Sequence, residues 1–378
     1  MEFTVARRDL AAIVATAAHA LPIRPPVPVM AGLRLTASAD GQLEAAGFDY
    51  EVSTRSTTTC TVTRPGQALV SGRLLADITR ALPDQPVHLT VDATRATLTC
   101  GRARFTLWLL PVDEYPALPQ LPSAVGQVDA ELWAAAVTQT VAAAGRDDTL
   151  PVLTGIRVEV EGDKVTLAAT DRYRFTVREL PWKPEQTGHS AVALVPAKTL
   201  HETAKALAGA GSIDLALSTG TRGDSGLLGL TGSDLAITTR LLEGEFPKFR
   251  ALFPTEFTSI ATVPTGPFAA AVKRVALVAE RNTPVRLGFT QDGLTIEGGS
   301  GDDAQAVDRV DADLEGDDIS IAFNPGYLLD GLTAANSPVI QLAFTTSTKP
   351  ALLQGRADQD AEPDDAFKYL IMPVRLSG

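Results

Sequence analysis

The chain has 378 residues, of which 45% are hydrophobic and 21% charged, and its formal net charge is −12. These values are typical of folded globular domains and exclude a disordered or fibrous chain. The acidic balance argues against a simple basic nucleic-acid-binding protein. The two cysteines, Cys60 and Cys100, lack metal-site spacing, so we expect buried thiols in a reducing compartment.

Three parts of the sequence repeat one another. Residues 69–75, 194–200 and 322–329 are similar, and they are spaced about a third of the chain apart. Residues 28–32 recur as 151–155, and residues 47–49 recur as 169–171. Three domains of about 125 residues would each have the usual domain size. The repeat predicts the domain ranges 1–120, 127–246 and 247–378.

The expected elements follow one pattern within each repeat. A strand over residues 3–5 leads to an alanine-rich and leucine-rich helix over residues 7–21, and alternating strands follow over 32–37, 43–48 and 51–62. After a turn at Pro65-Gly66, the pattern returns as a strand over 68–71, a helix over 73–82 and strands over 87–91, 97–100 and 104–109. Two such β-α-β-β-β units per domain predict an α+β fold with six helices. Our working count of strands in the chain is about eighteen.

The N-terminal segment imitates a signal peptide. Two arginines precede an apolar run, and residues 18–20 resemble a cleavage site. The acids Glu2 and Asp9 are atypical of such peptides, and the same pattern returns at residues 130–137 and 266–272. We therefore expect a domain helix. Since no apolar run reaches the roughly 20 residues of a membrane span, we expect a cytoplasmic protein without a membrane partner.

The expected helices carry more positive charge than the rest of the chain. They hold nine basic and six acidic residues, which predicts a helical surface that faces a polyanion. Six helices spaced 8–10 Å apart would close a ring with a bore of about 10 Å, too narrow for a duplex roughly 20 Å wide. Twelve helices from two chains give a bore of roughly 30 Å, so a head-to-tail dimer is the assembly that fits around DNA.

Several motifs occur in a characteristic order. Residues 369–376 read Tyr-Leu-Ile-Met-Pro-Val-Arg-Leu, residues 169–175 read Ala-Thr-Asp-Arg-Tyr-Arg-Phe, residues 244–249 read Gly-Glu-Phe-Pro-Lys-Phe, and residues 3–5 read Phe-Thr-Val. Along its full length the chain thereby resembles the bacterial DNA polymerase III beta subunits, the sliding clamps. Residues 146–155 are most similar to actinobacterial members. The resemblance implies three clamp domains whose helices line the bore of a ring and whose sheets lie outside.

The resemblance also implies a hydrophobic groove between the second and third domains. Such grooves bind short linear motifs of the replicative DNA polymerase, the clamp loader, repair polymerases and ligase. The apolar side chains of the motif enter the groove, and polar groups at its rim fix the orientation of the peptide. The implied residues are Leu153, Thr170, Tyr173, Arg174, Phe175, Pro247, Leu252, Tyr327, Leu370, Met372, Pro373, Val374 and Arg375. The alternative is ordinary interdomain core, which is the stronger interpretation for Leu153 or Leu370 alone.

Two positions depart from the family pattern. Arg172-Tyr173 stands where many clamps have Gly-His, and Ala251 stands where many have Arg. We expect both departures to change the shape of the groove.

Contacts with double-stranded DNA and with a second copy are implied in the same way. Nonspecific phosphate contacts would come from Arg24, Arg73, Arg80, Arg146, Lys198, Lys205, Lys273 and Arg281; each is also consistent with an ordinary solvated charge.

At the homodimer joint, Phe105 and Leu107 would meet Leu277 and Val278 of the other chain, with Arg102 and Arg104 facing Asp302 and Asp303. Ordinary core is the alternative for the four apolar residues.

Two other functions stay open. Residues 16–20 and 223–226 resemble the histidine and serine motifs of chymotrypsin-type proteases, but the residues after Gly226 lack the second glycine and the proline expected there. The other is an accessory clamp whose altered groove tolerates inhibitors. The four histidines are scattered and no nucleotide-binding motif occurs, so we expect no catalytic residue, no metal and no cofactor.

Overall fold

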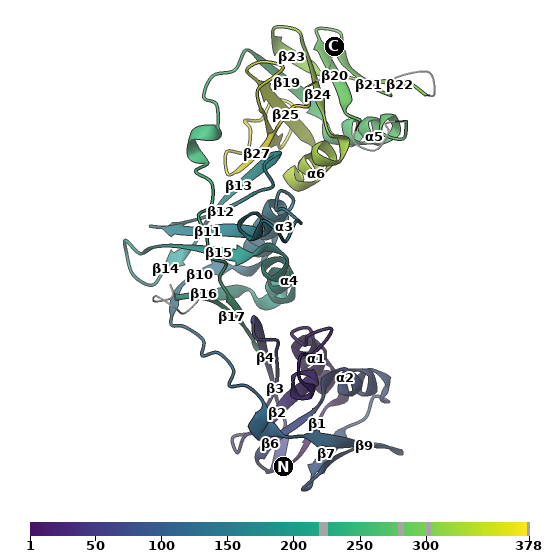
Figure 1. Cartoon of the computed structure of the whole chain (residues 1–378), viewed down its shortest axis with the longest axis vertical. Coiled ribbons are helices and arrows are strands. Elements are labelled where there is room, and N and C mark those ends of the chain that lie inside the picture. Colours follow the sequence, from purple (N-terminus) through teal and green to yellow (C-terminus); the bar gives the residue numbers. More distant parts are fainter. Residues whose placement is uncertain (219–225, 279–282, 300–303, 376–378) are drawn as a thin grey trace. The chain divides into compact units, whose positions relative to one another are not determined.

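The computed structural model describes residues 1–218, 226–278, 283–299 and 304–375. The chain forms two compact units: unit 1 comprises Met1–Glu131, Lys183–Thr187 and Glu202–Leu241, and unit 2 comprises Leu132–Trp182, Gly188–His201 and Leu242–Gly378. The α-helices of the described residues are α1 (Arg7–Ala18), α2 (Gly72–Ala81), α3 (Ala130–Val141), α4 (Ala197–Leu207), α5 (Thr265–Val275) and α6 (Pro325–Ala335) (Figure 1). None of these described helices is long and apolar enough to cross a membrane.

Unit 1 is built on one antiparallel sheet. Its strands lie in the order β14 (Lys183–Pro184), β10 (Ala124–Asp129), β16 (Ser212–Ser218), β17 (Leu227–Gly232), β18 (Leu235–Arg240), β4 (Val52–Thr59), β3 (Gln42–Phe48), β2 (Gly32–Ala37), β6 (Gly66–Ser71), β9 (Ala103–Leu110), β8 (Arg95–Cys100), β7 (Val87–Val91), β1 (Glu2–Val5) and β5 (Thr61–Arg64). The pairing of β18 with β4 joins distant parts of the sequence, and the buried hydroxyls of Ser53 and Thr238 are 2.6 Å apart across it.

The core of unit 1 lies between this sheet and two helices. The apolar face of α1 follows the helical period, and α1 packs against α2; the buried residues of α1 are Leu10, Ile13, Val14 and Ala17. A Cβ on Gly47 would lie 2.3 Å from the Ala17 carbonyl oxygen. Glycine at position 47 therefore lets β3 approach the end of α1 closely.

Unit 2 contains two antiparallel sheets. The larger has the order β15 (Ser190–Pro196), β11 (Gly155–Glu161), β12 (Lys164–Thr170), β13 (Arg174–Pro181), β27 (Phe367–Ile371), β26 (Ala351–Arg356), β25 (Val339–Phe344), β19 (Ser259–Pro264) and β23 (Asp313–Gly316). The smaller has the order β22 (Ala306–Val310), β21 (Gly293–Gly298), β20 (Val285–Thr290) and β24 (Ile319–Phe323). Because β13 pairs with β27, Phe175 lies opposite Leu370 and Thr176 lies opposite Tyr369.

The three similar segments, residues 69–75, 194–200 and 322–329, each contain the end of a strand and the start of a helix. Strands β6, β15 and β24 lead directly into α2, α4 and α6. The six expected α-helices are present in the described chain, but it has 27 strands instead of about eighteen.

The expected range 127–246 contributes residues to both units, because β18 pairs with β4 on one side and β13 pairs with β27 on the other. The three domain boundaries stay a prediction.

Two element predictions were wrong in detail. The first helix ends at Ala18, with His19 at its C-cap, three residues before the expected end. The expected strand 51–62 is broken at Cys60 into β4 and β5. The break arises because the two halves pair with different strands: β4 lies between β3 and β18, whereas β5 pairs with β1.

Gly331 on α6 provides a test of the packing in unit 2. A Cβ at this position would lie 2.6 Å from the Tyr369 ring. We therefore expect Gly331→Ala to destabilise unit 2 by about 1–3 kcal/mol through overpacking, which lowers its calorimetric unfolding temperature by about 2–12 °C. Gly266→Ala in α5 is the control, because its Cβ meets nothing within 4 Å. Equal unfolding temperatures for the two variants would contradict the close approach of α6 to β27.

Candidate functional site

A tight turn between β12 and β13 positions the first group of site residues. Asp171 Oδ1 accepts hydrogen bonds from the backbone N–H groups of Tyr173 (3.0 Å) and Arg174 (3.1 Å). Arg172, which lies between Asp171 and Tyr173, has a φ of 81°, in the left-handed region that favours glycine. Thr170 Oγ1 accepts from the Arg172 N–H and donates to the Arg174 carbonyl oxygen. The turn leaves the Tyr173 side chain exposed and the Arg174 side chain buried.

The same turn occurs in the first repeat. Asp49 Oδ1 accepts hydrogen bonds from the N–H groups of Glu51 and Val52. Tyr50, directly after Asp49, has a φ of 76°. The sequence similarity of residues 47–49 and 169–171 therefore reflects a shared backbone turn. The side chains that the two turns carry differ.

The buried Arg174 guanidinium is held by groups from three elements. Its Nε donates to Asp171 Oδ2 (3.0 Å), and its Nη1 donates to Asp330 Oδ2 (2.5 Å) and to Tyr369 Oη (3.5 Å). Burial alone disfavours the charged form, but Tyr369, Asp330 and Asp171 more than offset it, so the pKa of Arg174 is raised above its ordinary value. A buried cation is stable in this way only when hydrogen-bonded and paired.

Two tyrosines, Tyr327 and Tyr369, contact this cation, and a third, Tyr173, stacks on the Tyr327 ring. The Tyr327 ring centroid lies 4.5 Å from Arg174 Cζ, a cation–π distance, and 5.9 Å from the ring of Tyr173, at an interplanar angle of 21°. The hydroxyl of Tyr369 donates to the Tyr327 carbonyl oxygen at 2.8 Å. Burial raises the pKa of Tyr369, so it remains a neutral donor at physiological pH.

Tyr173, Arg174, Tyr327 and the two carboxylates border a cavity of about 530 Å³ in unit 2, which we call the tyrosine pocket. Its lining combines aromatic, aliphatic and charged side chains, and consists of Ala144, Gly145, Arg146, Asp147, Leu150, Leu153, Asp171, Arg172, Tyr173, Arg174, Gly326, Tyr327 and Asp330. The mixture suits a ligand with an apolar anchor and polar flanks.

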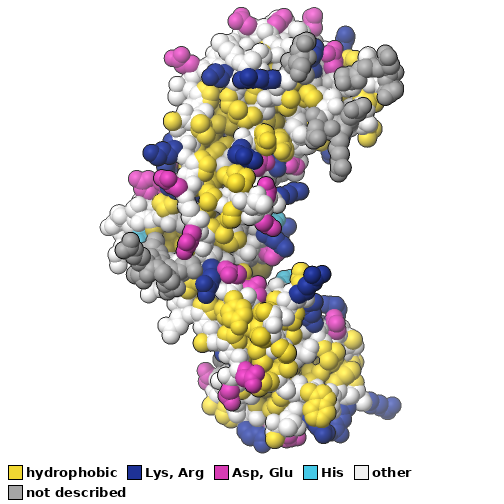
Figure 2. All heavy atoms as spheres, viewed as in Figure 1, with side chains coloured by type: hydrophobic (Ala, Val, Ile, Leu, Met, Phe, Trp, Pro, Cys, Tyr) yellow, Lys and Arg dark blue, Asp and Glu magenta, His cyan; other side chains and the backbone are white. Residues whose placement is uncertain are grey.

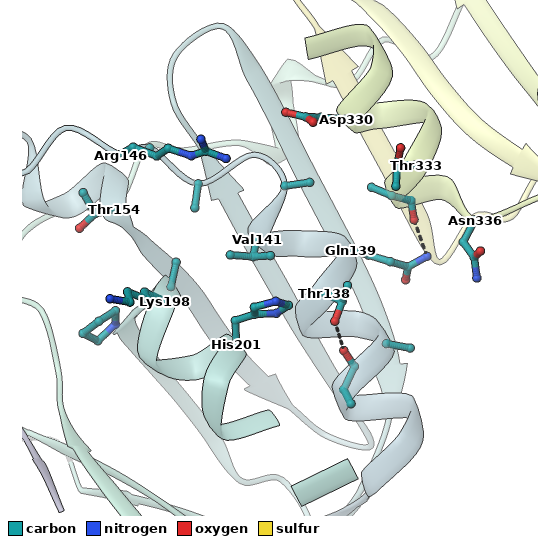
Figure 3. Close-up of a pocket in the computed structure, with 18 of the residues that line it drawn as sticks. Thr138, Gln139, Val141, Arg146, Thr154, Lys198, His201, Asp330, Thr333 and Asn336 are labelled. Atoms are coloured by element: carbon teal, nitrogen blue, oxygen red, sulfur yellow. Dashed lines mark hydrogen bonds between the residues drawn. The ribbon is translucent and has the colours of Figure 1, made fainter. Parts of the chain in front are cut away.

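A second concavity, of about 1100 Å³, lies between helices α3, α4 and α6, and we call it the helix hollow. Small side chains of α3 form much of its surface, and its charged members are Arg146, Asp148, Lys198 and Asp330. In Figure 3, Arg146 extends from the segment after α3 and Asp330 extends from α6. Gln139 Nε2 donates to the Ala334 carbonyl oxygen (2.9 Å), which ties α3 to α6. Arg146 and Asp330 line both concavities.

Four of the thirteen expected groove residues line the tyrosine pocket: Leu153, Tyr173, Arg174 and Tyr327. Thr170 is buried and holds the turn. Phe175 and Leu370 are buried members of a core cluster; their side chains are therefore core, the alternative already given for Leu370. The Met372 N–H donates to the Tyr173 carbonyl oxygen at 2.8 Å, so Met372 lies beside the pocket turn.

The remaining expected groove residues lie outside the pocket lining. Leu252, Met372 and Val374 are exposed large apolar side chains. Pro247 and Arg375 are exposed, and Pro373 is half-buried. Figure 2 shows hydrophobic side chains gathered on the face of unit 2 that carries β27 and α6.

The short turn before Leu252 is fixed by an ion pair. Arg250 Nη2 donates to Glu159 Oε1 at 2.9 Å, and Arg157 Nε donates to Glu159 Oε2 at 3.3 Å. Burial raises the pKa of the Glu159 carboxyl, but Arg250 and Arg157 more than offset this, and the net pKa lies below its ordinary value. Arg250, held by its ion pair with Glu159, therefore stands directly before Ala251.

The expected DNA-contacting residues that the structure describes are all exposed: Arg24, Arg73, Arg80, Arg146, Lys198, Lys205 and Lys273. Arg73 donates to the Pro22 carbonyl oxygen, and Arg80 pairs with Asp77 at 3.5 Å. The structure brings Arg146 and Lys198 together in the helix hollow. Arg281 lies outside the described residues.

At the expected dimer joint, Leu277 is 84% exposed and Val278 is half-buried, directly after α5. Phe105 is half-buried and Leu107 is buried, and both pack in the core of unit 1; Arg102 and Arg104 are exposed. Asp302 and Asp303 lie outside the described residues, as does the serine of the protease-like motif.

The sequence interpretation missed two site carboxylates. Asp171 stands in the motif of residues 169–175, and Asp330 is one of the six acidic residues of the expected helices, yet both bind Arg174. The missed signal was spacing, because Asp330 lies one helical turn after Tyr327. Within the described ranges, no cluster of three His, Cys, Asp or Glu side chains has the arrangement of a metal site.

Known proteins agree with this architecture along the whole chain. Residues 1–119, 127–248 and 250–375 match the N-terminal, central and C-terminal domains of the DNA polymerase III beta subunit. The beta sliding clamp of Streptomyces coelicolor is 64% identical over 378 residues and covers 100% of both chains, and the beta sliding clamp homolog GriR of Streptomyces muensis is 46% identical over 376 residues, again covering 100% of both. The crystal structure of the Bacillus subtilis DNA polymerase sliding clamp has 28% identity and a TM-score of 0.90 over 100% of both chains.

Proposed function

The chain belongs to the DNA polymerase III beta subunit family and has the function of a sliding clamp, and we propose that two copies close head to tail into a ring around duplex DNA. The full-length match to a beta sliding clamp at 64% identity carries this proposal. The ring would tether the replicative polymerase to its template in the cytoplasm. It needs no catalytic site or cofactor of its own.

The helix hollow is the proposed place of DNA contact in unit 2. Arg146 and Lys198 are exposed there, and neither belongs to any ion pair of the described residues. Asp148 and Asp330 line the same hollow, and their negative charges weaken the binding of phosphates. Weak, sequence-independent contacts of this kind suit a protein that slides.

The tyrosine pocket and the exposed apolar side chains near it are the proposed docking site for partner proteins. Stacked Tyr173 and Tyr327 offer aromatic surface, and Met372 adjoins the same turn. Short linear motifs of the polymerase, the clamp loader, repair polymerases and ligase would place apolar side chains here, as peptides do in hydrophobic grooves.

The accessory clamp remains the second candidate. The chain is 46% identical to the homolog GriR but 64% identical to the Streptomyces coelicolor clamp. The higher identity supports the principal clamp as the first candidate.

Neutralising the helix hollow tests the DNA contact. We expect Arg146→Gln with Lys198→Gln to weaken binding of a fluorescent 30-base-pair duplex about tenfold at low salt. The slope of log affinity against log salt should fall by about 1.8, since each lost phosphate contact removes about 0.9. The matched control is Lys248→Gln with Lys349→Gln, two exposed lysines outside the hollow. Equal losses for both pairs would show that net charge, and not the hollow, governs binding.

Charging the proposed dimer joint tests the assembly. We expect Leu277→Asp to convert a dimer into monomers in sedimentation velocity, because a carboxylate would enter an apolar joint. Ile23→Asp is the control, since Ile23 is equally exposed, at 81%, and lies outside the proposed joint. A monomeric unmodified protein at micromolar concentration, or a Leu277 variant that stays dimeric, would contradict the proposed interface.

A further inference from the structure

The tyrosine pocket depends on a contact between two segments that are distant in the sequence. We propose that Asp330 of α6 is a positioning residue for this pocket: it holds the Arg174 guanidinium against the Tyr327 ring and so fixes the surface on which a partner peptide docks. The inference rests on the proposed peptide-binding function of the pocket.

The two carboxylates that bind Arg174 have different tasks. Asp171 lies three residues before Arg174, and its Oδ1 is already used to close the turn. Its contact with Arg174 can therefore form without α6. Asp330 is 156 residues away from Arg174 in the sequence. Its bond is the charged contact that ties the turn to α6.

Helix α6 delivers an aromatic ring and a carboxylate to the same cation. Residues three apart on a helix lie on one face, so Tyr327 and Asp330 both reach Arg174. The start of the helix is fixed, because Asn324 Oδ1 accepts hydrogen bonds from the N–H groups of Gly326 and Tyr327. With the backbone held at its first turn, the Asp330–Arg174 bond sets how the guanidinium meets the Tyr327 ring.

Asp330 is also placed so that its removal leaves the fold intact. Its side chain is 48% exposed, whereas that of Arg174 is 6% exposed. Replacing Asp330 therefore opens no buried cavity, and Arg174 keeps its bonds to Asp171 and Tyr369. The expected effect is a reoriented guanidinium and a less ordered Tyr327 ring, which contacts both Arg174 and Tyr173.

Peptide affinity provides the first test. The probe is a fluorescein-labelled hexapeptide that ends in leucine and phenylalanine, an aliphatic and an aromatic anchor. We expect Asp330→Ala to raise its Kd about tenfold, which corresponds to about 1.4 kcal/mol, and Asp330→Asn to raise it about threefold, since the amide oxygen still accepts a hydrogen bond. Fluorescence anisotropy measures both.

The matched control is Asp364→Ala. Asp364 has a similarly exposed side chain (45%) and binds Arg178, on the same strand β13, at 2.8 Å, but it does not line the tyrosine pocket. This variant should leave the Kd unchanged. Against an Arg174→Gln background, Asp330→Ala should have almost no further effect, because a positioning residue acts through its partner. Additive losses would overturn the proposed route through Arg174.

A measurement without ligand separates this inference from the proposed function. The chain has five tyrosines, so fluorotyrosine labelling gives a simple ¹⁹F NMR spectrum. We expect Asp330→Ala to shift the signals of Tyr327 and Tyr173, each assigned by a Tyr→Phe variant, and Asp364→Ala to leave them in place. Unshifted signals, or a Kd equal to that of the unmodified chain, would overturn the inference. Shifted signals without any peptide binding by the unmodified chain would overturn the proposed function of the pocket and, with it, the docking role of Asp330.

Discussion

The pairing of β13 with β27 is the contact on which the rest of the site depends. It brings the turn that carries Tyr173 and Arg174 to the last strand of the described chain, where Tyr369 lies beneath the guanidinium. Helix α6 packs closely on β27 through Gly331 and thereby reaches the same cation with Tyr327 and Asp330. Residues of the second and third repeats become one site because they share one sheet.

The first two repeats share a backbone turn, but the side chains that the turn carries have diverged, and the turn of the second repeat lines the tyrosine pocket. In the turns at Asp49 and Asp171 the aspartate accepts the same two backbone hydrogen bonds, and the residue after it, Tyr50 or Arg172, is left-handed. In the second repeat the turn is followed by Arg174, which α6 can bind. The departure at Arg172 fits this picture, because a non-glycine residue is kept in a left-handed conformation by the bonds of Asp171 and Thr170.

The sequence predicted local structure better than it predicted the site. Periodicity and turn residues located the six helices, and the repeated segments predicted three strand-to-helix junctions correctly. The break at Cys60 was missed because strand partners, and not local preference, divide β4 from β5. Family motifs suggested Tyr173, Arg174 and Tyr327, which do line one pocket. The spacing of Asp330 from Tyr327 indicates one shared helix face, but a single sequence does not reveal that this face meets Arg174, 156 residues away.

In the proposed ring, DNA is retained because the protein encloses it, and not because the protein binds its phosphates tightly. The most direct measurement is retention on nicked circular DNA at high salt after loading by a clamp loader, before and after the circle is linearised. Because phosphate contacts weaken steeply with salt, a topological tether predicts retention on circles and release after cutting. Release by salt from both circular and linear DNA would contradict the claim and indicate an ordinary electrostatic binder.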